Sequence, residues 1–410
     1  MFARFLKKPL AWALLAVLGP AWTLNMGRLM SEKPALAFLL ASLYALVRGC
    51  EEAEAKKDAW LLGSGMLMGL ALLSKYAAGA AVPAALWYLR DRKTGAGRAA
   101  WWAATACGPA ALYLAARPEL VSGAAATMAG ASEGAWGAPV HRARSIAAFL
   151  GGLAVLPALG RFPRRTLGAA LAGAALLFVP WLDAASVRPL DRATGAWLAA
   201  GGLAALWTAA AARKAAGRAL WLPWLAGAAL FAAAYWTVTS RVVLFAVPPL
   251  VLALGAAFES GGEKRSPAPA AAALAAALSL ALGWVDFVYA GAQKDLAAEL
   301  AATGRPVRVA ARLGLRHYLL RAGARPLDGE DDWKALRPGE LAAFARTTTN
   351  FHPATPRRVN TRAIRVGSAV PLRLISGFGG EAGFYSNVSG FLPFSVSSEP
   401  VEEFTVVEAL

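Results

Sequence analysis

Residues 268 to 291 read APAAAALAAALSLALGWVDFVYAG, and these 24 residues contain a single charged side chain, Asp286. A helix needs about 20 predominantly apolar residues to cover the roughly 30 Å of hydrocarbon in a bilayer. Similar apolar runs of 15 to 24 residues recur toward the amino terminus and are rich in Ala and Gly. Strands of an outer-membrane barrel would be about 10 residues long and would alternate in polarity. The sequence therefore predicts a helical membrane protein.

The composition of the whole chain agrees with this prediction. Of 410 residues, 58% are hydrophobic and 16% are charged, and the mean hydropathy is +0.47. A soluble globular chain carries about 45 to 50% apolar and about 25% charged residues. These values exclude an ordinary soluble domain, a disordered chain and a collagen. The two cysteines, Cys50 and Cys107, are interpreted as inert thiols rather than a disulfide.

Apolar runs bounded by charges, Gly or Pro predict about eleven transmembrane helices. Several are shorter than about 20 residues and would need flanking residues or a thinner bilayer to span it. The predicted spans are residues 9–27, 34–48, 59–74, 76–89, 99–116, 146–160, 167–184, 195–211, 219–238, 242–257 and 268–291.

The distribution of basic residues predicts the orientation of these spans. When alternate loops are assigned to the two sides, one side holds 18 Lys and Arg residues and the other holds 9. The richer side is predicted to be cytoplasmic, which also places the amino terminus there. The formal charge of +17 follows from this bias, so we expect no nucleic-acid partner. The expected location is a bacterial inner (plasma) membrane, and no cleavable signal peptide is evident.

The last part of the chain has a different character. Residues 292–410 are less apolar than the preceding part and contain no run long enough to span a membrane. Residues 307–310 are typical of a strand, 313–322 of a helix, and the last forty residues alternate as strands around Gly and Pro. We therefore expect an all-α polytopic membrane domain over residues 1–291, followed by a small extracytoplasmic α/β domain over residues 292–410.

Polar groups at the predicted outer ends of the spans are candidates for function, because burying them in a membrane is costly. Glu32, beside Pro34, could bind a metal ion or act as a base on an acceptor hydroxyl; the alternative is a solvated helix start. Lys75 is the basic residue between two apolar runs and could bind a lipid-linked phosphate. Alternatively, it reaches the interface with Tyr76 as an aromatic anchor, without a ligand.

Two further places suggest a ligand. Arg241 stands at the start of an apolar run, where its planar guanidinium could grip an anionic head group; an interfacial packing role is the alternative. The loop over residues 117–144 is long and rich in Gly and Ala, as in a flap over a substrate cleft. His141 in this loop is a candidate substrate-binding residue or a merely solvated one. Phosphate-cradling Gly loops, Cys/His metal motifs and a serine nucleophile elbow are missing.

Several segments occur in the same order in one family of membrane enzymes. They are Ser31 to Pro34, Gly65 to Tyr76, Ser240-Arg241 running into Pro248-Pro249, Leu315 to Leu320, Gly323 to Pro326, Gly383 to Tyr385 and Gly390 to Phe394. In these segments the chain resembles the polyprenyl-phosphate-sugar glycosyltransferases of the GT-C class. That group includes the protein O-mannosyltransferases and the lipid A aminoarabinose transferase.

The resemblance implies a hexosyl- or pentosyltransferase that moves a sugar from a polyprenyl phosphate to a hydroxyl of a lipid, glycan or protein on the outer face. It implies an outer-loop carboxylate as general base, sometimes with a divalent Mg²⁺ or Mn²⁺ ion near the donor phosphate. By position, Glu32 matches the family's second acidic site, which is normally an Asp. Lys75 and Arg241 match basic residues near the donor phosphate.

The chain departs from the family pattern at its start. Family members open with one more span, an outer loop with the principal acidic pair, and a returning span, and the printed sequence begins after that point. We expect either an enzyme with a misplaced start or an inactive truncated relative that still binds the donor lipid. A third interpretation is a lipid-linked-sugar carrier or flippase that performs no chemistry.

Overall fold

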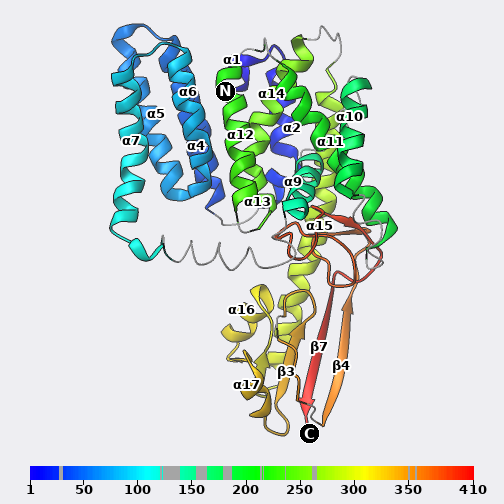
Figure 1. The fold of residues 1–410 in the computed structure, drawn as a ribbon. Helices are drawn as coiled ribbons and strands as arrows, with labels where there is room; N and C mark the ends of the chain where they lie inside the picture. The colour runs from blue at the N-terminus through cyan, green and yellow to red at the C-terminus, as the bar shows by residue number, and fades with distance from the viewer. Residues whose placement is uncertain are drawn as a thin grey trace. The chain divides into compact units, whose positions relative to one another are not determined.

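The computed structural model describes residues 1–26, 31–120, 122, 139–153, 164–178, 187–212, 215, 217–235, 237–260, 266–349, 351–355 and 358–410. The chain divides into two compact units (Figure 1). The first, which we call the helical unit, comprises Met1–Ser279 together with Gly383–Pro393. The second, the sheet unit, comprises Leu280–Ala382 and Phe394–Leu410. The boundary predicted after residue 291 stays a prediction.

The described part of the helical unit is built from helices. They are α1 (Phe2–Phe5), α2 (Pro9–Leu18), α3 (Pro20–Met26), α4 (Glu32–Glu51), α5 (Glu54–Ser74), the 3-10 helix η1 (Tyr76–Ala81), α6 (Val82–Asp91), α7 (Ala96–Ala115), α9 (Pro139–Leu153), α10 (Arg164–Phe178), α11 (Pro189–Ala211), α12 (Arg218–Ala234), α13 (Ser240–Val243), the 3-10 helix η5 (Leu244–Ala246), α14 (Val247–Ser260) and the first part of α15 (Ala268–Ala302). The mostly helical prediction is confirmed.

The count of eleven spans is not supported. Among the described residues, three helical stretches are long and apolar enough to cross a membrane: Glu32–Glu51, Ser240–Ser260 and Ala268–Ala302. The backbone breaks other predicted spans. The run over residues 9–27 is divided at Gly19-Pro20 into α2 and α3, because Pro20 lacks the amide hydrogen that would continue α2. The run over residues 76–89 becomes η1 and the ten-residue α6, which is about 15 Å long.

Small residues let the helices of this unit approach closely. A Cβ on Gly202 of α11 would collide with the carbonyl oxygen of Ala147 in α9, and one on Gly151 would collide with that of Leu198. A Cβ on Gly227 of α12 would likewise collide with Ala80 in η1. Close backbone contact at small residues is a main source of helix association in membranes. The abundance of Gly in the sequence thus has a packing reason at these positions.

The sheet unit contains a five-stranded mixed sheet with the strand order β2-β1-β3-β7-β4. Its strands are β1 (Val307–Val309), β2 (Arg325–Pro326), β3 (Leu341–Ala345), β4 (Val359–Val366) and β7 (Glu402–Ala409), and β5 (Leu372–Arg373) pairs with β6 (Ser395–Val396) in a second sheet. Strand β1 is parallel to β2 and β3, whereas β7 is antiparallel to β3 and β4. Helices α16 (Leu313–Arg321) and α17 (Glu330–Lys334) connect the parallel strands. The predicted strand at 307–310 and helix at 313–322 correspond to β1 and α16.

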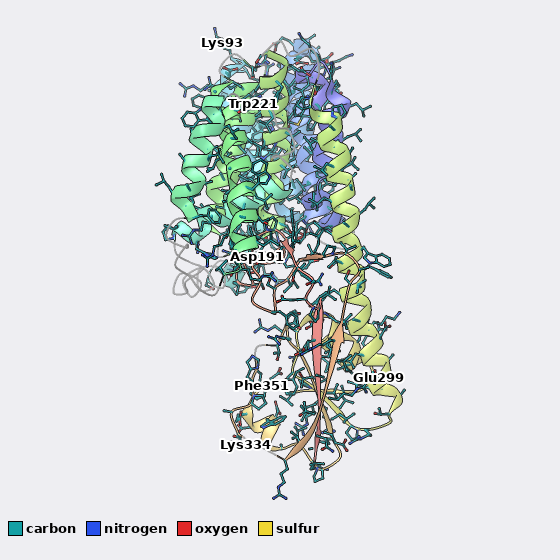
Figure 2. All side chains as sticks on the ribbon, turned by 90° about the vertical axis from the view of Figure 1, so that its right-hand side faces the viewer. Lys93, Asp191, Trp221, Glu299, Lys334 and Phe351 are labelled. Atoms are coloured by element: carbon teal, nitrogen blue, oxygen red, sulfur yellow. The ribbon has the colours of Figure 1, made fainter. Side chains whose placement is uncertain are left out.

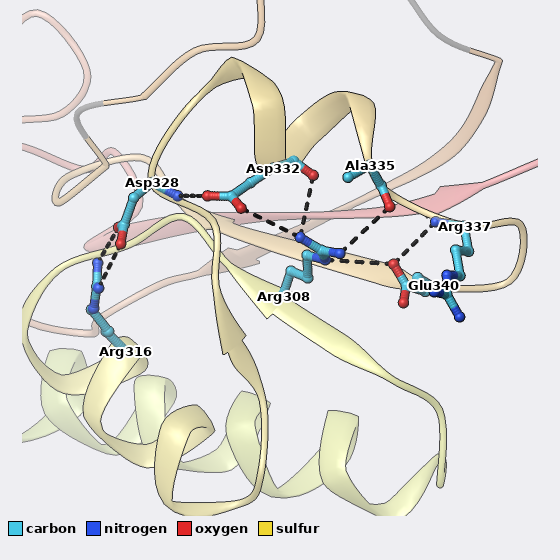
Figure 3. Close-up of polar contacts among 7 residues, drawn as sticks. All are labelled: Arg308, Arg316, Asp328, Asp332, Ala335, Arg337 and Glu340. Carbon is cyan, nitrogen blue, oxygen red and sulfur yellow. Dashed lines mark hydrogen bonds and ion pairs between the residues drawn. The ribbon is translucent and has the colours of Figure 1, made fainter.

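Ion pairs hold the connections of this sheet in place (Figure 3). Arg308 on β1 contacts Asp332 of α17 at 3.6 Å and Glu340 at 3.5 Å. Arg316 on α16 donates two hydrogen bonds to the Asp328 carboxylate, at 2.5 and 3.0 Å. This guanidinium lowers the pKa of Asp328. The basic residues of the sheet unit therefore include structural ones.

One carboxylate of the sheet unit is fully buried. Glu402, at the start of β7, accepts hydrogen bonds from the Thr347 amide at 3.1 Å, the Glu403 amide at 3.0 Å and the Thr347 hydroxyl. Burial raises the pKa of Glu402, and the hydrogen bonds offset part of that rise. The carboxylate is thus held in its place by donors but destabilised by the loss of water.

Candidate functional site

A buried ion pair joins two of the predicted site residues. Glu32, the first residue of α4, is 1% exposed, and its Oε1 lies 3.2 Å from the Nζ of Lys75. Lys75 ends α5 in an extended conformation, which turns the chain into η1. A buried carboxylate without a partner would be very costly, so this pairing explains how Glu32 is tolerated in an apolar surrounding.

Two tyrosines lie beside this pair. The Tyr76 hydroxyl donates a 2.7 Å hydrogen bond to the hydroxyl of Tyr235, which follows α12 directly. The Nζ of Lys75 lies 5.4 Å from the centre of the Tyr76 ring, and Phe231 stacks on Tyr235. The Lys75 ammonium is therefore bounded by a carboxylate on one side and an aromatic face on another.

Arg241 comes to the same place from α13. The hydroxyl of Thr239 caps this helix by accepting a hydrogen bond from the Val242 amide at 3.2 Å. The cap fixes the start of α13, and with it the position of Arg241. Ser240 is buried and faces Asn25 of α3, whose side-chain nitrogen lies 3.3 Å from its hydroxyl.

These side chains line one cavity of about 110 Å³. At about 10 to 15 Å³ of such space per water molecule, it has room for several waters or a phosphate-sized group. Its lining consists of Glu32, Lys75, Tyr76, Ala77, Phe231, Tyr235, Thr237, Thr239, Arg241, Val242 and Tyr385. Four of the five predicted site residues, separated by up to 209 positions, thus share one cavity.

Part of the cavity wall comes from the segment Gly383–Pro393, which folds into the helical unit. The Oδ1 of Asn387 accepts hydrogen bonds from the Thr237 hydroxyl at 2.7 Å and the Val238 amide at 3.0 Å. The backbone N–H of Asn387 in turn donates a hydrogen bond to the Val238 carbonyl oxygen at 2.9 Å. These bonds fix the segment beside the residues that lead into α13 and place Tyr385 at the cavity.

Sequence reasoning missed these residues. Gly383-Phe384-Tyr385 was singled out as part of the family resemblance, but no role followed from it. Tyr385 and Asn387 lie more than 140 positions beyond Arg241, in a part of the chain predicted to form a different domain. The Gly383-Phe384-Tyr385 segment was the signal that could have led to them.

The structure places His141 elsewhere. In the part of the chain that the structure describes, His141 does not line the cavity. Its Nε2 lies 3.4 Å from the carbonyl oxygen of Asn387, so His141 contacts the segment Gly383–Pro393 that forms part of the cavity wall. Residues 121 and 123–138 of the predicted flap lie outside the described residues.

The described residues do not form a metal site of the usual kind. They contain no group of three or more His, Cys, Asp and Glu side chains that could hold an ion. Within the described lining of the cavity, Glu32 is the one acidic side chain, and Lys75 already pairs with it. This donor set does not fit a metal held by protein ligands, because Mg²⁺ needs oxygen ligands that are not neutralised by a cation. The predicted role of Mg²⁺ or Mn²⁺ stays a prediction.

Residues 3–109 match the family model of the dolichyl-phosphate-mannose-protein mannosyltransferases. The match confirms the predicted resemblance over α1 to α7, the part that contains Glu32, Lys75 and Tyr76. Arg241 and Tyr385 lie beyond the part matched to this mannosyltransferase family. No curated protein and no solved structure matches the chain.

The family match over residues 3–109 suggests a membrane glycosyltransferase, and the described residues include three helical stretches long and apolar enough to cross a membrane. Mannosyltransferases of this family imply a donor in which the sugar is linked to a polyprenyl phosphate, and an acceptor for that sugar. The match does not extend to the identity of the sugar or of the acceptor.

Proposed function

We propose that this protein transfers a sugar from a polyprenyl phosphate to a hydroxyl group of a lipid, glycan or protein on the outer face of the membrane. The observation that carries the proposal is the cavity, which gathers one carboxylate and two cations from residues 32, 75 and 241. The carboxylate can accept a proton, and the two cations can bind a phosphate. The family match at residues 3–109 supports the same donor class.

In this proposal, Lys75 and Arg241 bind the phosphate of the donor. Both line the cavity, and Lys75 is held between Glu32 and the Tyr76 ring. An ammonium and a guanidinium together stabilise the negative charge that grows on the phosphate when the sugar leaves. The paired hydroxyls of Tyr76 and Tyr235 offer a further donor toward the same space.

Glu32 is proposed as the general base. The oxygen of the acceptor hydroxyl attacks the anomeric carbon, and the bond from that carbon to the phosphate oxygen breaks. The bonding electrons leave with the polyprenyl phosphate, and the hydroxyl proton goes to the Glu32 carboxylate. Because Glu32 is 1% exposed, the hydroxyl must enter the cavity to reach it. No step of this reaction is routed through a metal ion.

The donor site can be tested without knowing the sugar, by measuring binding of undecaprenyl phosphate to the purified full chain. Removing one charge-assisted contact, in Lys75→Gln or Arg241→Gln, should weaken binding by about tenfold or more. Lys33→Gln serves as a control, because Lys33 neighbours Glu32 in sequence but does not line the cavity. Equal weakening in all three variants would show a diffuse charge effect and would refute the site.

The role of Glu32 needs a test of turnover. Glu32→Gln keeps the shape of the side chain but cannot accept a proton, so transfer of radiolabelled sugar to a membrane fraction should fall by about 100-fold or more while undecaprenyl phosphate still binds. A carrier that performs no chemistry would bind the lipid and transfer no sugar even with Glu32 intact. Unchanged transfer in Glu32→Gln would exclude Glu32 as the base.

A further inference from the structure

A second pocket lies in the helical unit, at the opposite end of α6 and α12 from the candidate site. Helix α6 begins directly after η1, whose Tyr76 lines the first cavity, and ends at Asp91. Helix α12 runs from Arg218 to a point next to Tyr235, and its 17 residues span about 25 Å. Figure 2 shows Lys93 and Trp221 toward one end of this unit and Asp191 at the other.

This pocket, which we call the α6–α12 pocket, has a volume of about 480 Å³. Its lining includes Trp87, Tyr88, Asp91 and Arg92 from the end of α6 and Arg218 and Pro223 from α12. It lies outside the donor site described above and shares no lining residue with it.

The charge of the α6–α12 pocket favours an anion. The guanidinium of Arg92 lies 5.0 Å from the centre of the Tyr88 ring, and that of Arg90 lies 5.8 Å from the Trp87 ring. Among the described residues, Arg92 makes no ion pair. Arg218 supplies a second cation to the lining, and Asp91 supplies one opposing carboxylate. The cations therefore outnumber the acid.

The aromatic residues of the pocket suit a membrane boundary. Trp87 is 55% exposed, whereas the neighbouring Tyr88 is 1% exposed and presents its ring to Arg92. Tryptophan is enriched where the hydrocarbon of a bilayer meets the head groups, because its ring is apolar and its N–H is polar. A free soluble anion would gain nothing from an exposed indole, whereas the glycerol and upper acyl chain of a lipid would pack on it.

From the cations and the exposed indole together, we propose that the α6–α12 pocket binds the head group of an anionic glycerophospholipid. Arg92 and Arg218 contact the phosphate, and Trp87 packs on the glycerol region. Basic pockets between transmembrane helices are a known form of lipid recognition. In the orientation predicted from the loop charges, the lipid belongs to the cytoplasmic leaflet, opposite the proposed sugar transfer.

Lipid binding to the purified full chain in detergent, measured by native mass spectrometry with phosphatidylglycerol as the probe, tests the proposal. The double variant Arg92→Gln/Arg218→Gln should bind phosphatidylglycerol about 100-fold more weakly or worse, since it removes two charge-assisted contacts that each contribute about tenfold or more to the affinity. The matched control is Lys8→Gln/Lys56→Gln. It removes the same charge from two exposed residues of the helical unit, and neither lines the pocket.

Equal loss of binding in the two double variants would overturn the proposal, because it would show general attraction rather than a pocket. Displacement of phosphatidylglycerol by inorganic phosphate at constant ionic strength would indicate a site for free anions and would also overturn it. Should the double variant fail to fold, Trp87→Ala changes an exposed residue and should weaken binding several-fold. Unchanged binding in Trp87→Ala, with equal affinity of the wild type for phosphatidylcholine, would contradict the lipid assignment.

Discussion

Replacing Lys75 should destabilise the helical unit far more than replacing its partner Glu32. Glu32 is 1% exposed, so Lys75→Ala leaves a buried carboxylate without its cation. Removing one partner of a buried ion pair costs about 3 to 5 kcal/mol. The side chain of Lys75 is 24% exposed, so in Glu32→Gln the ammonium can turn toward solvent. We expect a loss of about 1 kcal/mol for Glu32→Gln, which is the usual size of a lost hydrogen bond.

The double variant decides between this explanation and simple loss of packing. With Glu32→Gln in place, Lys75→Ala no longer strands a charge, so the double variant should recover about 2 kcal/mol relative to Lys75→Ala alone. Equilibrium unfolding of the purified chain in mixed micelles, with rising fractions of sodium dodecyl sulfate, measures the four free energies. If Lys75→Ala is as stable as the wild type, or if the double variant is less stable than Lys75→Ala, the reasoning is refuted.

Asn387→Ala should cost about 1 to 3 kcal/mol, because it removes the acceptor of two buried hydrogen bonds, including the one from Thr237, and it should weaken undecaprenyl phosphate binding by loosening the cavity wall. Unfolding and binding titrations on the same sample check this, and unaltered binding would show that the wall segment does not shape the site. Gly202→Val should lower stability by about 1 to 3 kcal/mol because its side chain meets the backbone of α9, whereas the control Gly168→Val meets nothing within 4 Å. Similar unfolding curves for these two variants would contradict the packing argument. Glu402 has a raised pKa in the folded state, so its contribution to the sheet unit is favourable at low pH and is lost as the pH rises from about 4.3 through the folded-state value. Glu402→Gln should remove this part of the pH dependence, as measured by hydrogen exchange of the β3 and β7 amides, and an unchanged profile would assign it to other groups.

The sequence alone determined the class of protein and several residues of the candidate site. Hydropathy is a local property, so apolar runs could be recognised as helices, and α4, α5, α7 and α12 lie close to where they were expected. Charged residues at the ends of such runs are costly to bury, and those that are present are therefore often functional. This is why Glu32, Lys75 and Arg241 could be selected without a structure. The order of several short segments pointed to the family resemblance that the match at residues 3–109 confirms.

Sequence patterns did not predict features that depend on backbone geometry or on contacts with distant segments, such as helix breaks and the surroundings of a side chain. The break at Gly19-Pro20 and the 3-10 helix η1 divide apolar runs that look continuous by composition, and the described residues do not support the count of eleven spans. The sequence left open whether His141 binds a substrate or is merely solvated. In the structure its Nε2 lies 3.4 Å from the carbonyl oxygen of Asn387.

The tertiary structure decided which of these groups lie together. It paired Glu32 with Lys75, brought Arg241 to the same cavity, and folded Gly383–Pro393 into the helical unit so that Tyr385 completes the wall. Part of this arrangement depends on hydrogen bonds between segments more than 100 residues apart, such as those of Asn387 with Thr237 and Val238. The sequence shows which residues are costly to bury, whereas the partner that offsets the cost is set by the fold, because burial and Coulomb attraction depend on distance in space.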